Sequence, residues 1–223
     1  MILLQMEIKE IGFIRKFVYL CRNIRNRFSY ANGRNNRILN SGQKVNSRFQ
    51  ITGEGNKILI EKGALLLNSL IRINGNNNTV LLKEGSYISG AELWVEDNNC
   101  EINIGRKTFI GHHSHLACTE NRSKLLIGDN GMISSYVQIR TGDSHSILDN
   151  DGNRINYAQS VIIGDHVWIG EGAKVLKGVT LQSDTVVATG SIVTKSYDKK
   201  NVLLAGVPAK IIKEDITWLS ERI

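Results

Sequence analysis

The residues best suited to chemistry lie in one polar stretch, which runs from Arg140 to Ser160. His145 stands there beside Asp143 and Ser144. Histidine titrates near neutral pH and can take a proton from a hydroxyl group, which typically raises a rate by about 10²–10⁴-fold. The stretch predicts His145 as a general base and Asp143 as a carboxylate that orients its ring. A solvated surface loop without chemistry is the alternative.

A repeat pattern predicts the scaffold on which this stretch is mounted. From Ile163 to Val193 an aliphatic residue recurs at every sixth position, as Ile163, Ile169, Val175, Leu181, Val187 and Val193. A period of six fits neither a helix nor an ordinary two-faced strand. It fits a triangular coil of about 18 residues that is built from three short strands. The prediction is an all-β solenoid with a core of stacked aliphatic side chains.

The upstream half repeats with a longer period. Aliphatic residues are spaced 22, 22, 22 and 23 positions apart at Ile38, Ile60, Leu82, Ile104 and Ile127. Polar insertions precede the last four, for example Asn74–Asn78. Asparagine and glycine tolerate positive φ, so we interpret the insertions as bulging corners of four or five residues added to each coil.

Two end segments fall outside the repeats. Residues 5–28 place apolar residues at helical spacing with Lys and Arg between them, and Glu214 to Arg222 is compatible with a short capping helix. The predicted organisation is a basic helical segment at 1–37, a β-helix at 38–195 with an active-site loop at 140–160, and a C-terminal loop and capping helix at 196–223. The basic helix either packs on the prism or a neighbouring copy, or makes peripheral contact with an anionic membrane surface.

Composition narrows the class of protein. The net charge of +7 comes from residues 1–50, which carry +8, so the basicity belongs to one segment and does not predict a nucleic-acid partner. Three cysteines without CxxC spacing favour reduced thiols. The sequence has no apolar run of about 18 residues and no secretory signal pattern. We expect a cytoplasmic protein, peripheral at the inner membrane surface if the basic helix contacts lipid.

Five motifs together resemble the hexapeptide-repeat acyltransferases, and most of all the O-acetyltransferases of bacterial capsule and surface polysaccharides, with galactoside and maltose acetyltransferases as relatives. The motifs are Asp143–Ser146, Ile163–Gly170, Gly178–Thr180, Thr189–Lys195 and Ala205–Lys213. The resemblance covers 127–213 strongly and 38–126 only as a repeat. It implies a left-handed parallel β-helix, a homotrimer with active sites between neighbouring prisms, and acetyl-CoA as co-substrate without a metal.

The resemblance also assigns roles. It implies that His145 is the general base and that Trp168 lies beside the acetyl-bearing end of coenzyme A. The positions that match coenzyme A contacts are Gly170, Thr189, Thr194, Lys195, Lys210 and Lys213. The loop Ser196–Lys200 lacks the proline usual in relatives. The predicted reaction is direct transfer of acetyl to a sugar hydroxyl, of a bacterial surface polysaccharide or its precursor.

Three other interpretations stay open. An N-acetyltransferase that acts on an amino sugar uses the same parts. The second is a metal-dependent carbonic anhydrase, which is built on the same scaffold. His112, His113 and His115 are clustered in the sequence as zinc ligands can be. The downstream pair of histidines, five residues apart, that those enzymes contain is missing from this sequence. A non-enzymatic scaffold has no need of His145 and Trp168.

Overall fold

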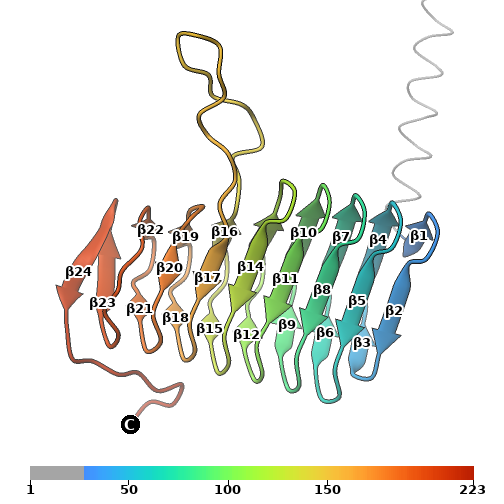
Figure 1. The fold of residues 1–223 in the computed structure, drawn as a ribbon. Helices are drawn as coiled ribbons and strands as arrows, with labels where there is room; N and C mark the ends of the chain where they lie inside the picture. The colour runs from blue at the N-terminus through green and yellow to red at the C-terminus, as the bar shows by residue number, and fades with distance from the viewer. Residues whose placement is uncertain (1–27) are drawn as a thin grey trace, which may run out of the picture.

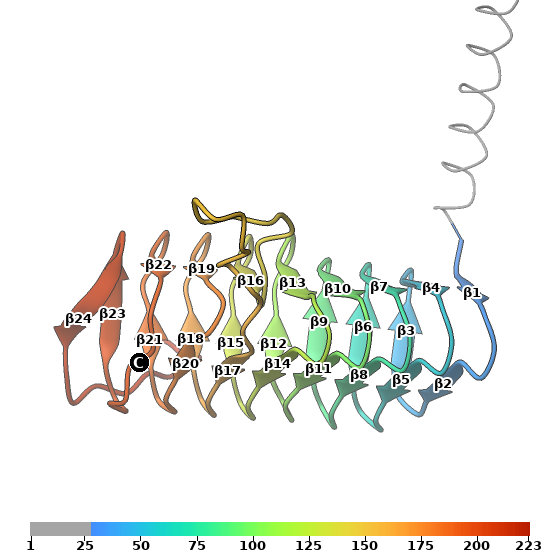
Figure 2. The same cartoon turned by 45° about the horizontal axis from the view of Figure 1, so that its top comes forward.

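The computed structural model describes residues 28–223 as a parallel β-solenoid of about seven coils (Figure 1). The part of the chain that is described contains strands, turns and irregular segments but no helix. Each coil contributes one strand to each of three sheets, and the strands of successive coils pair in parallel, so the sheets form the three sides of a long prism (Figures 1 and 2).

The strands are assigned to the three sides as follows. Sheet A contains β1 (Tyr30–Asn32), β4 (Arg48–Thr52), β7 (Leu70–Asn74), β10 (Glu92–Glu96), β13 (His115–Cys118), β16 (Gln138–Arg140), β19 (Lys174–Val175) and β22 (Ile192–Val193). Sheet B contains β2 (Arg37–Asn40), β5 (Lys57–Ile60), β8 (Thr79–Leu82), β11 (Glu101–Ile104), β14 (Lys124–Ile127), β17 (Val161–Ile163) and β20 (Thr180–Leu181). Sheet C contains β3 (Gln43–Val45), β6 (Leu65–Leu67), β9 (Tyr87–Ser89), β12 (Phe109–Ile110), β15 (Met132–Ile133), β18 (Trp168–Ile169), β21 (Val186–Val187), β23 (Leu203–Gly206) and β24 (Ala209–Lys213).

The predicted aliphatic ladders form the core of the prism. The six aliphatic residues from Ile163 to Val193 are all buried, and they fall on sheets B, C and A in turn. The upstream series stacks in register along sheet B from Ile60 onward. Ile38 departs from that series because its partner is Ile58. The first coil is thus shorter than its neighbours.

The polar insertions lie at the corner between sheets A and B. Asn56 and Asn78 are fully buried there, and each side-chain oxygen accepts a hydrogen bond from the backbone of the next coil, at 3.0 Å from Asn78 N and 2.8 Å from Cys100 N. Gly53 has a φ of +118°, and a Cβ there would lie 2.0 Å from the carbonyl oxygen of Gly75. The corner therefore requires the asparagines and glycines that the sequence supplies.

The C-terminal end corrects one expectation. The helix predicted at Glu214–Arg222 is wrong, because this segment is irregular and the last coil is closed by the antiparallel pair β23–β24. Asn201 holds the segment through its backbone oxygen, which accepts from Ile216 N at 3.0 Å, and through its amide, which donates to Ile216 O at 3.1 Å. Trp218 then reaches back to sheet C and is 9% exposed.

The helix predicted at 5–28 falls almost wholly outside the described residues. Within residues 28–223 the structure has no helix long and apolar enough to span a membrane.

Candidate active site

Residues 141–160, here called the site loop, leave the prism between β16 and β17 (Figures 1 and 2). The loop closes at its base, where Gln159 N donates to Thr141 O at 2.8 Å. Its outer part is a small hairpin, bridged between Leu148 and Arg154. The sequence therefore interrupts a regular scaffold with one ordered protrusion.

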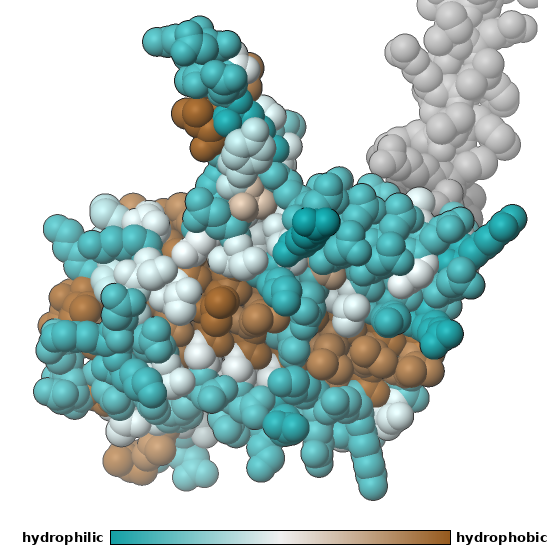
Figure 3. Space-filling view, viewed as in Figure 1, coloured by the Kyte–Doolittle hydropathy of each residue, from teal (hydrophilic) through white to brown (hydrophobic). Residues whose placement is uncertain are grey.

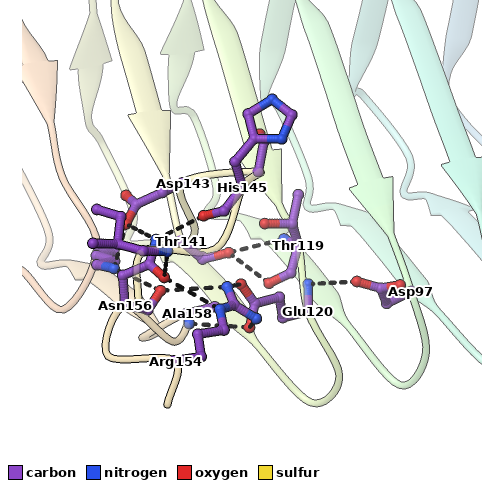
Figure 4. Close-up of polar contacts among 12 residues, drawn as sticks. Asp97, Thr119, Glu120, Thr141, Asp143, His145, Arg154, Asn156 and Ala158 are labelled. Atoms are coloured by element: carbon purple, nitrogen blue, oxygen red, sulfur yellow. Dashed lines mark hydrogen bonds and ion pairs between the residues drawn. The ribbon is translucent and has the colours of Figure 1, made fainter. Parts of the chain in front are cut away.

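Asn156 organises the inner part of the site loop (Figure 4). Its amide nitrogen donates to Asp143 Oδ2 at 2.9 Å and to His145 O at 2.7 Å. Its side-chain oxygen accepts from Ile147 N at 2.7 Å and from Arg154 Nε at 3.2 Å. Both donors and both acceptor sites of this amide are used. Asn156 thus fixes the backbone that carries His145.

Two ion pairs attach the site loop to the prism. Arg154 makes a bidentate pair with Glu120, with Nη1 to Oε2 at 3.1 Å and a second, shorter contact from Nη2 to Oε1. Lys177 donates to Asp143 Oδ2 at 2.5 Å and to Asn156 O at 2.9 Å. The Lys177 hydrogen bond holds the pKa of Asp143 below its ordinary value, and pairing with Glu120 raises the pKa of Arg154.

His145 is exposed, and its imidazole points away from this network (Figure 4). It stands at the edge of a groove of about 480 Å³ on sheet A, which is lined by Trp94, Glu96, His115, Ala117, Thr119, Arg140, Ser144 and His145. In the described part of the chain the ring has no hydrogen-bond partner. The Asp143 carboxylate contacts Lys177 and Asn156, so orientation of the His145 ring by Asp143 stays a prediction. The arrangement leaves an imidazole without a hydrogen-bond partner in residues 28–223 on a backbone that Asn156 holds in place.

Trp168 lies on sheet C, on a different side of the prism from the groove. Trp168 is 37% exposed, and its indole Nε1 donates to Ser134 Oγ at 3.2 Å. Within one chain the structure does not bring Trp168 and His145 together.

The positions predicted to contact coenzyme A are spread over the last coils. Gly170 and Thr189 are close neighbours, since a Cβ on Gly170 would lie 2.6 Å from Thr189 N. Thr194 and Lys195 follow β22 of sheet A, and Lys195 Nζ lies 5.7 Å from the centre of the Tyr197 ring. Lys210 and Lys213 are exposed on β24 of sheet C. Their roles stay predictions.

The residues that hold the site in place were not predicted from the sequence. Asn156, Lys177 and the Arg154–Glu120 pair act across separations of up to 34 residues, and nothing in the sequence pattern marks them. The site loop could be found as a break in the repeat, but its internal bonds could not.

A second group missed from the sequence lies beside Trp168. The Trp218 ring stacks on the His166 ring at 4.4 Å between centroids and 11° between planes, and its centroid is 6.0 Å from that of Trp168. Trp218 Nε1 donates to His166 O at 2.8 Å. His166 Nδ1 is 2.8 Å from Asp184 Oδ1. The C-terminal segment thus packs beside Trp168, the residue predicted to lie next to the acetyl end of coenzyme A.

The clustered histidines have separate surroundings. His112 Nε2 lies 3.4 Å from Ser89 Oγ, His113 stacks on Tyr136 at 4.9 Å between ring centroids, and His115 Nε2 lies 3.8 Å from Glu92 Oε2. Residues 28–223 contain no group of three or more His, Cys, Asp or Glu side chains arranged to hold a metal ion.

Comparison with curated proteins gives relatives over about half of the chain, while no family model matches it. The chain is 34% identical over 119 residues to the polysialic acid O-acetyltransferase of Escherichia coli O1:K1 / APEC, which is 53% of this chain and 38% of that protein. It is 34% identical over 120 residues to the enzyme of the same name from Neisseria meningitidis, covering 53% of this chain and 55% of that protein. These sequence matches span less than two thirds of either relative.

Comparison with solved structures extends the similarity over nearly the whole chain. The crystal structure of the polysialic acid O-acetyltransferase OatWY superposes with a TM-score of 0.83 at 31% identity, covering 86% of this chain and 92% of that chain. The likeness therefore includes the upstream coils, where the sequence shows only a repeat.

Proposed function

Because this chain belongs to the hexapeptide-repeat acyltransferase family, we propose that it transfers an acetyl group from acetyl-CoA to a sugar hydroxyl. The proposed acceptor is a surface polysaccharide or its precursor; the names of the two relatives give polysialic acid as theirs. The observation that carries the proposal is the imidazole of His145, which borders a groove and has no hydrogen-bond partner in residues 28–223, although Asn156 holds the backbone that carries it.

The proposed reaction is a direct transfer. His145 takes the proton of the acceptor hydroxyl while the oxygen attacks the thioester carbonyl of acetyl-CoA. The tetrahedral intermediate then expels the thiolate of coenzyme A, which receives the proton from the imidazolium. The products are an acetyl ester and free coenzyme A. Cys100 and Cys118 are buried in the prism, so an acyl-cysteine intermediate is not part of the proposal.

The acyl donor fits residues of sheet C and the last coils. Trp168 offers a half-exposed indole for the acetyl end. Lys195, Lys210 and Lys213 offer exposed amines, and lysine is a usual partner for phosphate as a point charge. These assignments stay part of the proposal together with Gly170, Thr189 and Thr194.

A homotrimer of left-handed prisms completes the proposal. His145 and Trp168 lie on different sides of one chain, so a site that uses both takes them from two chains. A partner surface is available on sheet B, where outward side chains form a row across the coils that is apolar on both sides of Asn103 (Figure 3). The row contains Leu39, Leu59, Leu81, Asn103, Leu126 and Ile162. Leu39 and Ile162 are 58% and 43% exposed, and exposed apolar side chains gathered on one face are typical of an interface.

The proposed location is the cytoplasm, where cysteines remain reduced. Whether residues 5–28 pack on the trimer or contact the inner membrane surface is a separate proposal, which liposome co-sedimentation of the full chain and of a chain lacking residues 1–28 tests.

A thiol-release assay with acetyl-CoA and a panel of surface glycans tests the activity. We expect wild type to release coenzyme A only with an acceptor, and His145→Ala to lower the rate by about 10²–10⁴-fold with an unchanged oligomeric state. His112→Ala is the matched control, because this exposed histidine lies outside the groove and should keep full activity.

The product identifies the acceptor atom. An ester is cleaved by mild alkali and an amide is not, so an alkali-stable product would replace O-acetylation by the N-acetylation of an amino sugar. Undiminished turnover by His145→Ala would remove this residue as the base.

A further inference from the structure

The C-terminal segment 214–223 lies against a side of the prism and not across its end. The last coil is already closed by β23 and β24, and β18 lies two strands in from β23 along sheet C. After β24 the chain turns back along the prism toward β18 (Figure 1). Within 214–223 only Trp218 is buried, while Thr217 and Leu219 on either side of it are exposed. The segment therefore brings one large aromatic ring to sheet C.

The position of the Trp218 ring is fixed by contacts with two neighbouring coils. Its Nε1 donates to His166 O at 2.8 Å, and its ring stacks on the imidazole of His166. That imidazole is itself held, because its Nδ1 lies 2.8 Å from Oδ1 of Asp184 in the next coil. Ile216, two residues before Trp218, is tied to Asn201 by two hydrogen bonds. An irregular segment with these anchors presents its tryptophan in one defined place.

The solenoid itself confines the indole of Trp168 from the two neighbouring coils. Trp168 is paired in register with Met132 on one side and with Val186 on the other. The next residue of the strand, Ile169, is fully buried in the core. Successive side chains of a strand point to opposite faces, so the Trp168 indole faces outward between those of Met132 and Val186.

Along the strand the indole meets one partner at each end of β18. At the far end Ser134 accepts from Trp168 Nε1 at 3.2 Å, and Ser134 N donates to the backbone oxygen of the last residue of the strand at 2.9 Å. At the near end His166 precedes the strand by two residues and carries Trp218, whose ring centroid is 6.0 Å from that of Trp168. Trp218 thus closes the side opposite Ser134 and leaves only the outward face of the indole open.

We propose that Trp218 is a specificity-determining residue of the acyl-donor site. It blocks the side toward which the Trp168 indole would otherwise move, and so keeps the space for the acyl group small enough for acetyl but not for longer acyl chains. This inference rests on the proposed function, because that function places the acetyl end of acetyl-CoA beside Trp168. It adds that a residue of the C-terminal segment, far from the repeats in sequence, selects the donor.

The test measures dissociation constants of the full chain for coenzyme A, acetyl-CoA and butyryl-CoA by calorimetry, without any acceptor. A methylene that does not fit an apolar site costs about 10–200-fold. We therefore expect wild type to bind acetyl-CoA at least about tenfold more tightly than butyryl-CoA. In Trp218→Ala the two thioesters should bind within about threefold of each other, because the vacated space lets the indole of Trp168 move aside.

Free coenzyme A separates selection of the acyl group from a merely structural role. It has no acyl group, so its Kd should be the same in Trp218→Ala and in wild type within about threefold. Trp218→Phe keeps a ring against Trp168 and should restore the preference for acetyl-CoA. Leu219→Ala is the matched control, because this side chain of the same segment is 61% exposed, and it should leave all three constants unchanged. If Trp218→Ala does not fold, Trp218→Leu should lower the preference in the same direction.

The outcomes distinguish this inference from the proposed function. An unchanged preference for acetyl-CoA in the folded Trp218→Ala or Trp218→Leu variant would overturn the inference and leave the acetyl transfer intact. An equal loss of affinity for all three ligands would overturn it as well, since that is the effect of a structural role alone. Binding that selects acetyl-CoA through Trp218, without acetyl transfer to any glycan, would support the inference and contradict the proposed reaction. Absence of binding of all three ligands to wild type would overturn both.

Discussion

The prism and the site loop hold their residues in place by different means. In the prism each strand is fixed by backbone bonds to the coils on either side and by a core of stacked aliphatic side chains. In the site loop the backbone carrying His145 is held mainly by side chains, with Asn156 at the centre and ion pairs to Glu120 and Lys177 at the edges.

This difference separates stability from activity. Each coil packs on similar coils on either side, so its side chains contribute mainly to the free energy of unfolding of the prism. The site loop buries little apolar surface, and its polar bonds serve to position one imidazole. Substitutions in the prism should therefore lower the free energy of unfolding, whereas substitutions in the loop should lower the rate of transfer.

The largest effect on stability is expected from Ile102→Ala. Ile102 is fully buried in β11, and removing a buried isoleucine side chain costs about 2–5 kcal/mol in transfer and cavity terms. Urea unfolding followed by circular dichroism measures the loss. Asn103→Ala is the matched control, because Asn103 is on the same strand but faces outward, and it should cost less than about 1 kcal/mol. Equal losses in both variants would contradict a core in this register.

A smaller effect, on activity alone, is expected from Asn156→Ala. The change removes the donor to His145 O and the acceptor for Ile147 N, so the imidazole loses its fixed position. A misplacement of about 1 Å can cost about 10²-fold in rate, which corresponds to about 2.7 kcal/mol. Turnover and thermal melting should be measured together, and the melting temperature should move by only a few degrees. Asn153→Ala, at the tip of the loop, serves as the control and should retain near-normal turnover.

The comparison also explains what the sequence could predict. The ladder from Ile163 to Val193 was predictable because a repeat displays its period many times. The bonds of Asn156 were not predictable, since the site loop occurs once and its partners are set by the folded shape. The segment Glu214–Arg222 was misjudged for the same reason. The spacing of apolar residues in this segment is compatible with a helix. In the folded chain, however, Trp218 donates to the backbone oxygen of His166, which lies 52 residues earlier in the sequence.

The smallest expected effect is a difference between the site loop and the prism in hydrogen-exchange protection at low pH. Lys177 and Asn156 hold the pKa of Asp143 below its ordinary value of 3.8, so this anchor is fully formed above that value and is lost as the pH falls through the lowered pKa. Hydrogen exchange of the loop peptide, corrected for intrinsic rates, should show constant protection from pH 7 to pH 5 and a decline only below about pH 4. Strands of the prism such as β11 should keep their protection over the same range, because no carboxylate holds their backbone bonds. In Asp143→Asn the decline should be smaller, and what remains should come from the other carboxylates that hold the loop, Glu120 and Asp149. A decline already between pH 7 and pH 5 would instead identify a histidine, and not the Asp143–Lys177 pair, as the group that secures the loop.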